Sequence, residues 1–288
     1  MAGVSPSASG EVLCTKRNGV VVARETCKKK EAPLDLAQFG AVGPPGPSGP
    51  DGPFAWERTC PPDSVLVGTV CVDKYEASVW TIPAVATDLV EAVRAGTASA
   101  ANLVAAGATQ VSLSTSCAPA PSTGFPSTGN WTEPLYAASV PGVVPTGCLS
   151  WFQAVQACAL AGKRLATNEE WQRAAAGTPN VAPCVFTGTE PTVTGTPGCV
   201  SSWGAFDMAG NVYEWVTAWG DLATDCTNWP PTYGSDYLCI GGDGSSHLPG
   251  ALSRGGSFGF GSDGGIFAAV AGFAPTLSSN VVGFRCVR

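Results

Sequence analysis

The chain has 288 residues, a formal net charge of −7 at pH 7, and charged side chains at only 13% of its positions. The charge is uneven, because residues 1–58 are nearly balanced, whereas residues 59–288 carry eight basic and sixteen acidic side chains. Such an acidic body repels phosphate backbones, which disfavours nucleic-acid binding, and no apolar run approaches the ~20 residues that span a bilayer.

The twelve cysteines form no CxxC pair, and eight of them lie close together in four pairs. This spacing favours local disulfides that close short loops, at Cys14/Cys27, Cys60/Cys71, Cys184/Cys199 and Cys226/Cys239. A zinc site is the alternative, but metal-type spacing is missing and His247 is the only histidine. Disulfides imply an oxidising compartment, so we expect an extracellular or cell-surface protein. The first residues show no leader, which favours removal of a leader before residue 1.

Residues 1–39 are expected to form a small Cys-bridged hairpin segment. Two apolar runs flank Arg17-Asn18-Gly19, and Asn-Gly is a strong hairpin-turn signal. Residues 40–58 follow as a linker, in which glycine recurs every third position and is usually followed by proline. This pattern resembles collagen, because only glycine fits the axis of a triple helix. Two interpretations stay open: an extended semi-rigid linker or a stalk that assembles homotrimers.

Residues 59–288 are expected to form one large domain. Its first stretch, VLVGTVCVDKYEASVW, alternates apolar and polar residues around Gly68-Thr69, which predicts two strands. Residues 81–146 are a low-complexity insert rich in Ala, Thr, Ser, Pro and Val. We expect one short helix there, at DLVEAVRAG, and otherwise irregular structure.

Two short capped helices are predicted after residue 148. In the first, Ser150 and Gln153 have the spacing of a capping box, and Gly162 stops the helix. In the second, Thr167 and Glu170 repeat this spacing. Beyond the second helix the sequence predicts only loops, rich in glycine and tryptophan.

Four motifs then occur in a fixed order, behind VDKYEASVW: AGKRLATNEEW, FDMAGNVYEWV, SRGGSF and VVGFRCVR. Together they resemble the sulfatase-modifying-factor family, whose founding activity is the formylglycine-generating enzyme, over roughly residues 62–288. The resemblance implies an α+β fold related to C-type lectins. Such a fold is loop-rich, with two short helices and small antiparallel sheets.

The resemblance also implies a calcium site beside the GNVYEW motif. Its ligands would be the carboxylates of Asp207 and Glu214 and the backbone carbonyls of Gly210 and Val212, which are oxygen donors that Ca²⁺ prefers. The alternative is structural, with Asp207 capping a turn and Glu214 pairing with an arginine.

Two further features of the frame follow from the resemblance. A family disulfide would join Cys158 to Cys286. Arg254 and Arg285 are expected to be buried structural partners of carboxylates or carbonyls.

The catalytic groups of the family are missing. Its enzyme binds copper through two cysteines beyond the GGS motif, and those positions fall on Phe260 and Gly265. Neither residue can ligate copper(I), which prefers thiolates. His247 alone is a poor candidate for a general base. We therefore expect no copper and no catalytic residues.

These observations predict a non-catalytic, exported module that binds a protein or glycan ligand at a surface. Recognition would fall in residues 258–281, through Phe258, Phe260, Ser262, Asp263, Phe267, Phe273, Thr276 and Asn280. Three tryptophans could form walls of the site or belong to the core, namely Trp203, Trp215 and Trp219.

Other interpretations remain open. One alternative is a metal-dependent oxidoreductase of the family with an altered active site, and another is a structural protein whose arm assembles trimers. The chain also resembles the variable proteins of diversity-generating retroelements, which place their mutable surface before a closing GFR motif.

Overall fold

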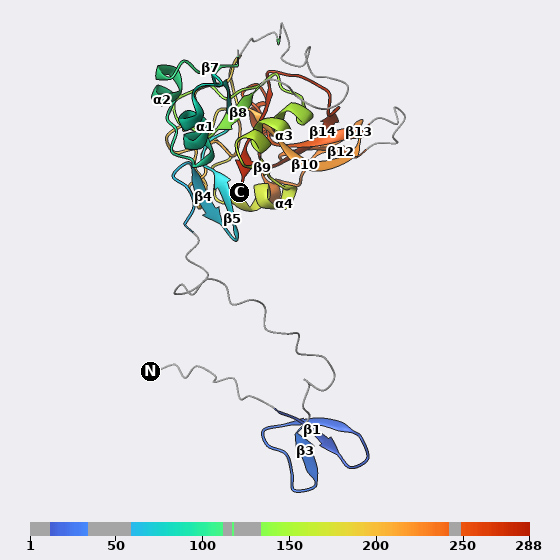
Figure 1. Cartoon of the computed structure of the whole chain (residues 1–288). Helices are drawn as coiled ribbons and strands as arrows, with labels where there is room; N and C mark the ends of the chain where they lie inside the picture. The colour runs from blue at the N-terminus through green and yellow to red at the C-terminus, as the bar shows by residue number, and fades with distance from the viewer. Residues whose placement is uncertain (1–11, 34–58, 112–116, 118–133, 242–248) are drawn as a thin grey trace, which may run out of the picture. The chain divides into compact units, whose positions relative to one another are not determined.

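The computed structural model describes residues 12–33, 59–111, 117, 134–241 and 249–288. The chain divides into two compact units, Met1–Glu57 and Arg58–Arg288 (Figure 1). The collagen-like stretch 40–58 and His247 lie outside the described residues.

The first unit contains a three-stranded antiparallel sheet with the order β2-β1-β3. Strands β1 (Val12–Lys16) and β2 (Val21–Arg24) form the hairpin predicted around Asn18-Gly19, and β3 (Glu31–Pro33) pairs with the other edge of β1. Gly19 has a φ of +81°, which an L side chain rarely adopts. The disulfide Cys14–Cys27 ties β1 to the segment before β3.

The second unit begins with the two predicted strands, β4 (Ser64–Val67) and β5 (Val70–Asp73). They join a four-stranded sheet of order β4-β5-β16-β9, completed by β9 (Arg164–Leu165) and β16 (Cys286–Val287). The C-terminal strand β16 thus lies between β5 and β9, and β9 is part of the segment that links the two predicted helices. The disulfide Cys158–Cys286, expected from the resemblance, bonds β16 covalently to the first of these helices.

The expectation of irregular structure in residues 81–146 is wrong for the part that the structure describes. Besides the predicted helix α1 (Thr87–Arg94), this part holds α2 (Ala100–Ala105), β7 (Thr109–Gln110) and β8 (Leu135–Ala138). Strand β6 (Ser78–Thr81) pairs with both β7 and β8. The many small Ala and Thr side chains give these elements no clear periodic pattern in the sequence. A few buried apolar residues, such as Leu103 and Leu135, hold them in place.

The two predicted capped helices are confirmed. Helix α3 (Trp151–Leu160) has a complete capping box between Ser150 and Gln153, and α4 (Asn168–Ala174) has one between Thr167 and Glu170. Helix α3 contacts β8 and β9, and its buried face joins the largest apolar cluster of the unit.

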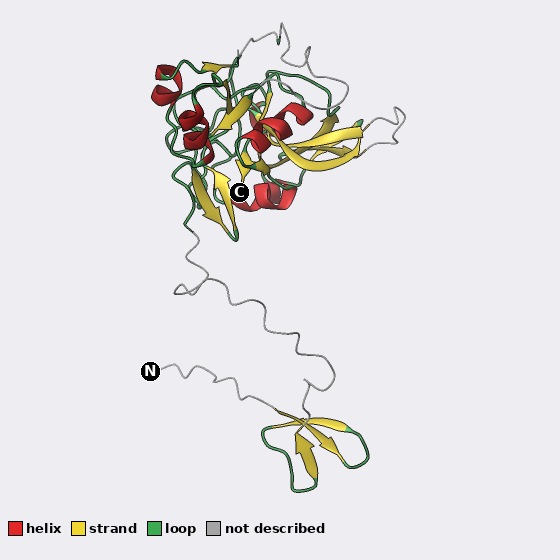
Figure 2. Ribbon diagram, viewed as in Figure 1, coloured by secondary structure: helices red, strands yellow, loops and turns green. Residues whose placement is uncertain are grey.

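The prediction of loops after residue 177 is also wrong. A six-stranded mixed sheet dominates this part, as Figure 2 shows in yellow. Its order is β11-β12-β14-β13-β10-β15, with β10 (Tyr213–Asp221), β11 (Asp225–Asn228), β12 (Tyr237–Gly241), β13 (Pro249–Gly255), β14 (Gly265–Phe273) and β15 (Val282–Phe284). Two single-turn 3₁₀ helices, η3 (Pro231–Tyr233) and η4 (Gly261–Asp263), lie in its loops. Glycine- and alanine-rich strands such as β14 have weak intrinsic β-propensity, and their pairing with neighbours decides their conformation.

Candidate functional site

The GNVYEW motif forms a tight turn that leads into β10. Asp207, Gly210 and Asn211 all have positive φ values, of 55°, 78° and 56°. The turn is held from the other side by the GGS motif, since Gly210 N donates to Gly255 O at 3.0 Å and Phe258 N donates to Asn211 O at 2.8 Å. Two motifs far apart in sequence therefore build one frame.

A buried ion pair lies directly behind this turn. Arg285 Nη2 is 2.6 Å from Glu214 Oε1, and Arg285 Nε donates to Glu214 Oε2 at 2.7 Å. Trp171 Nε1 adds a third hydrogen bond to Glu214 Oε2 at 2.7 Å. The structural role expected for Arg285 is confirmed, and the pairing considered for Glu214 is present.

Two more carboxylates surround the same guanidinium. Asp207 Oδ2 accepts a hydrogen bond from Gly195 N at 2.6 Å, so it holds a turn. Glu76, from the VDKYEASVW stretch, accepts from the Asn211 side-chain amide at 2.6 Å. Burial raises the pKa of Glu76 well above its usual value, and the nearby charge of Asp207 adds to this effect.

Arg285 is the cation of this cluster. Burial lowers its pKa, but the charges of Glu214, Glu76 and Asp207 outweigh burial and raise it. Three buried carboxylates therefore face one guanidinium, and the cluster is formally anionic.

The carboxylates of Asp207 and Glu214 are of the hard oxygen type that calcium prefers. Both are already engaged within the protein, because Asp207 accepts hydrogen bonds from Gly195 N and Thr196 N, and Glu214 accepts from Arg285 and Trp171. Gly210 and Val212 lie between the two carboxylates in the same turn. Arg285 competes for Glu214, and in the described part of the chain no three His, Cys, Asp or Glu side chains form a metal-binding group. The calcium site stays a prediction.

The resemblance assigns the two copper-ligand positions to Phe260 and Gly265, which here hold an aromatic ring and a glycine. The ring of Phe260 lies edge-on to Tyr213 and Tyr237, with centroids 5.2 and 5.1 Å apart. At Gly265, any Cβ would collide with the side chains of Asn180 and Asp236. All twelve cysteines are in six disulfides, including Cys117–Cys148, which the sequence did not predict.

Arg254, the other predicted structural arginine, is buried beside α4. Its guanidinium lies 5.0 Å from the ring centre of Trp171, and it donates to the side chain of Gln172 and to the carbonyl of Ile266. Burial lowers the pKa of Arg254 to about 10. The expectation that Arg254 is buried and bonded to carbonyls is confirmed.

The predicted recognition residues occupy different environments. Phe258 is buried, and Phe273 packs against Tyr213 and Trp215. Thr276 is exposed, and Asn280 is half-buried with its backbone against Gly147.

The remaining predicted residues adjoin β11 and η3. Ser262 is exposed, Asp263 accepts a hydrogen bond from the Asn228 amide at 3.1 Å, and Phe267 lies edge-on to Tyr233 at 5.3 Å. Trp229 donates its ring N–H to Phe267 O at 3.0 Å. We call Ser262, Asp263, Phe267, Trp229 and Tyr233 the η3–η4 surface. Sequence reasoning missed its last two members, although the NWPPTY stretch carries aromatic and turn residues together.

The three candidate tryptophans differ in exposure. Trp215 is buried in the core, whereas Trp203 and Trp219 are 42% and 45% exposed. Trp219 stacks edge-on with Trp151 and Phe152 on the outer side of α3. Trp215 is therefore no wall of a site.

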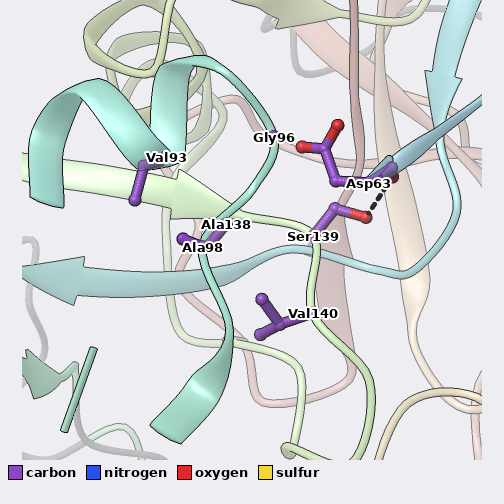
Figure 3. Close-up of a pocket in the computed structure, with 7 residues that line it drawn as sticks. All are labelled: Asp63, Val93, Gly96, Ala98, Ala138, Ser139 and Val140. Atoms are coloured by element: carbon purple, nitrogen blue, oxygen red, sulfur yellow. Dashed lines mark hydrogen bonds between the residues drawn. The ribbon is translucent and has the colours of Figure 1, made fainter. Parts of the chain in front are cut away.

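A small hollow lies between the segment after α1 and the end of β8 (Figure 3). Its walls include Val93, Val140 and Ser139, whose hydroxyl donates to Asp63 O at 2.9 Å. The hollow leaves no room even for a water molecule, so it is a packing feature rather than a ligand site.

Several solved structures are similar to this chain. The Major Tropism Determinant I1 variant is 26% identical over 48% of this chain and 37% of its own length, with a TM-score of 0.36. The P3c variant of the same protein is 20% identical over 79% and 52%, with a TM-score of 0.45. PvdO from Pseudomonas aeruginosa is 20% identical over 50% and 61%, with a TM-score of 0.32. This chain spans about half or less of the length of the two variants.

Curated proteins give no match to the chain. A family model does match, over residues 186–288, and it describes a Sulfatase-modifying factor enzyme 1-like domain. The matched segment contains the GNVYEW turn, the GGS motif and the closing GFRC motif described above. The C-terminal part of this chain, residues 186–288, is thus similar to the sulfatase-modifying-factor family.

Proposed function

We propose that the chain is a non-catalytic module that binds a ligand. Its scaffold resembles the formylglycine-generating enzyme and displays the ligand-binding surface. One observation carries this proposal: aromatic packing and backbone occupy the positions where the family's enzyme needs two thiols. Phe260 packs on Tyr213 and Tyr237, and every cysteine of the chain is bonded to another. Copper(I) chemistry requires soft thiolate donors.

A rigid frame supports the surface loops. The Glu214–Arg285 pair and disulfide Cys158–Cys286 are buried, and backbone hydrogen bonds join the GNV and GGS turns. Such a scaffold fixes exposed side chains in place and lets their identity set specificity. We assign recognition to the η3–η4 surface, whose half-exposed aromatic rings suit stacking and whose Asp263 and Ser262 offer hydrogen bonds.

The proposed setting is outside the cytoplasm. Six disulfides are compatible with an oxidising compartment. None of the helices in the described ranges is long and apolar enough to cross a membrane. The partner would be a protein or glycan at a surface. The homotrimer through residues 40–58 remains a hypothesis that analytical ultracentrifugation can test.

Two kinds of assay test the proposal, the first of catalysis and the second of binding. The purified chain should produce no aldehyde from a cysteine in a sulfatase-derived peptide, and elemental analysis should find no stoichiometric copper or iron. Aldehyde formation would instead establish the oxidoreductase alternative.

The second assay places the chain on glycan and peptide arrays. Asp263→Ala and Phe267→Ser should each lose the binding that the unchanged chain shows. Glu91→Gln, an exposed change on α1, is the control and should retain it. Binding that survives both changes would refute the η3–η4 surface as the site.

Diversification of the C-terminal residues is a separate hypothesis from the sequence resemblance. It requires a near-identical template repeat and a reverse-transcriptase gene beside the coding region. Sequencing that region decides it.

A further inference from the structure

Residues 12–33 are a basic stretch of the N-terminal unit, whose residues 1–57 together carry six basic and six acidic side chains. This stretch contains six Lys or Arg side chains and two Glu side chains. One of the two carboxylates is already used, because Glu31 Oε2 lies 3.0 Å from Arg24 Nε and also accepts a hydrogen bond from Lys28 N. In this unit, no other ion pair is present among the described residues. Among the described residues, five cations therefore have no ion-pair partner: Lys16, Arg17, Lys28, Lys29 and Lys30.

The fold brings three of these cations together around one hollow on the surface of the unit. The hollow has a volume of about 350 Å³ and is lined by Lys16, Arg17, Asn18, Lys30 and Glu31. Lys16 ends β1 and pairs in register with Glu31 at the start of β3. The hairpin turn at Arg17-Asn18 and the lysine run therefore meet, although they are about a dozen residues apart in sequence.

This unit has little apolar interior. Val20 and Val21 are 48% and 45% exposed, whereas Cys14 is fully buried in its disulfide. A sheet of this size is marginal without a covalent bridge. Like charges crowded on it repel one another, and an anionic ligand would relieve that repulsion. The Cys14–Cys27 disulfide thus holds the sheet together in spite of this repulsion. The five cations without an ion-pair partner do not themselves stabilise the fold.

We propose that the β1–β3 unit binds an anionic polysaccharide. The hollow would take one sulfate, carboxylate or phosphate group through Lys16, Arg17 and Lys30, and Lys28 and Lys29 would contact the next group along the polymer. Repeated anionic groups match a surface of several lysines, each acting as a point charge.

The composition of residues 12–33 argues against single-stranded nucleic acids and membrane surfaces as partners. Residues 12–33 contain no Phe, Trp, Tyr or His. Single-stranded nucleic acids are typically bound by aromatic side chains on which bases stack. Membrane-surface segments combine a basic face with a large apolar or aromatic face, whereas here the exposed apolar side chains Val20 and Val21 are small. This site is separate from the η3–η4 surface and does not depend on it.

The test uses the full chain and surface plasmon resonance with immobilised dextran sulfate and polygalacturonate. Neutral dextran, double-stranded DNA and phosphatidylglycerol vesicles serve as comparison probes. We expect both anionic polysaccharides to bind, and the affinity to fall by about tenfold or more between 50 and 200 mM salt because the contacts are ionic.

Charge-matched variants locate the site. Lys16→Gln/Arg17→Gln/Lys30→Gln should weaken polysaccharide binding by about tenfold or more. Arg94→Gln/Arg164→Gln/Arg173→Gln removes the same charge from the second unit and should change it by less than about twofold. Glu25→Gln, which removes an exposed carboxylate, should strengthen binding.

Peptide mapping must find the Cys14–Cys27 bond in each variant, so that a loss of binding reports charge rather than unfolding. Equal binding by the two triple variants would overturn the proposal. So would binding to neutral dextran, or binding to DNA or vesicles without binding to either anionic polysaccharide.

Discussion

Arg285 donates hydrogen bonds to both carboxylate oxygens of Glu214, with Nη2–Oε1 and Nε–Oε2 distances of 2.6 and 2.7 Å. Both side chains are almost completely buried. Arg285 also donates to the backbone carbonyls of Asp73 and Phe206. One guanidinium thus joins the closing GFRC motif to the strand β10 and to the N-terminal part of the unit. The pair belongs to the buried interior of the unit and not to an exposed surface.

Removing one partner of this pair should strongly destabilise the protein. Arg285→Met would leave the Glu214 carboxylate buried without its cation, at a cost of about 3–5 kcal/mol. The free energy of unfolding from urea denaturation measures the effect.

The exposed pair Arg164–Glu170 offers the matched control, with a distance of 2.6 Å and an arginine side chain that is 48% exposed. Arg164→Met should cost no more than about 1 kcal/mol. A similar cost for the two substitutions would contradict the importance of burial.

Asp73 should make stability depend on pH. Burial raises its pKa to about 6, against the attraction of Lys163 Nζ at 2.7 Å from Oδ1. The folded state then holds the proton more tightly than the unfolded state, whose value is near 3.8. Protonated Asp73 therefore contributes its full stabilisation below pH 3.8. This contribution is lost as the pH rises through about 6.

Asp73→Asn should remove this contribution. The stability of the unchanged chain relative to the variant should fall between pH 4 and pH 7, measured by urea denaturation at several pH values. Asp88→Asn, an exposed carboxylate of α1, controls for the loss of one charge. A relative stability that does not change across this range would rule out the raised pKa.

The calcium prediction has a direct thermal test. Millimolar calcium should raise the melting temperature of the unchanged chain, because a ligand that binds only the folded state stabilises it by about 2.7 kcal/mol at one hundred times its Kd. Asp207→Ala should abolish the shift, whereas Asp221→Ala, at an exposed position of β10, should keep it. No heat in calorimetry and no shift in the unchanged chain would count against the site.

The disulfides with the longest and the shortest sequence separation should contribute differently to the free energy of unfolding. Cys158–Cys286 closes 128 residues, whereas Cys60–Cys71 closes 11. In the chain-entropy model the long loop corresponds to about 5 kcal/mol and the short one to about 3 kcal/mol. Double substitution by alanine at each pair, followed by urea denaturation, compares them. A larger loss at the short loop would show that native packing, not loop closure, dominates.

The sequence alone determined features that depend on short separations. The capping boxes at Ser150/Gln153 and Thr167/Glu170 join residues three positions apart, and the four predicted local disulfides close loops of 11 to 15 residues. The absence of cysteine between Cys239 and Cys286 can likewise be read from the sequence without coordinates.

Only the tertiary structure decided which distant residues meet. Glu76 joins the Asp207–Glu214–Arg285 cluster across 135 residues, through its bond to Asn211. The strand order of the six-stranded sheet, the Cys117–Cys148 bond and the meeting of Lys16 with Lys30 likewise had no local signal. The physical reason is that capping and turn energies are set within a few residues, whereas strand pairing and charge burial depend on packing between segments whose separation the local sequence does not encode.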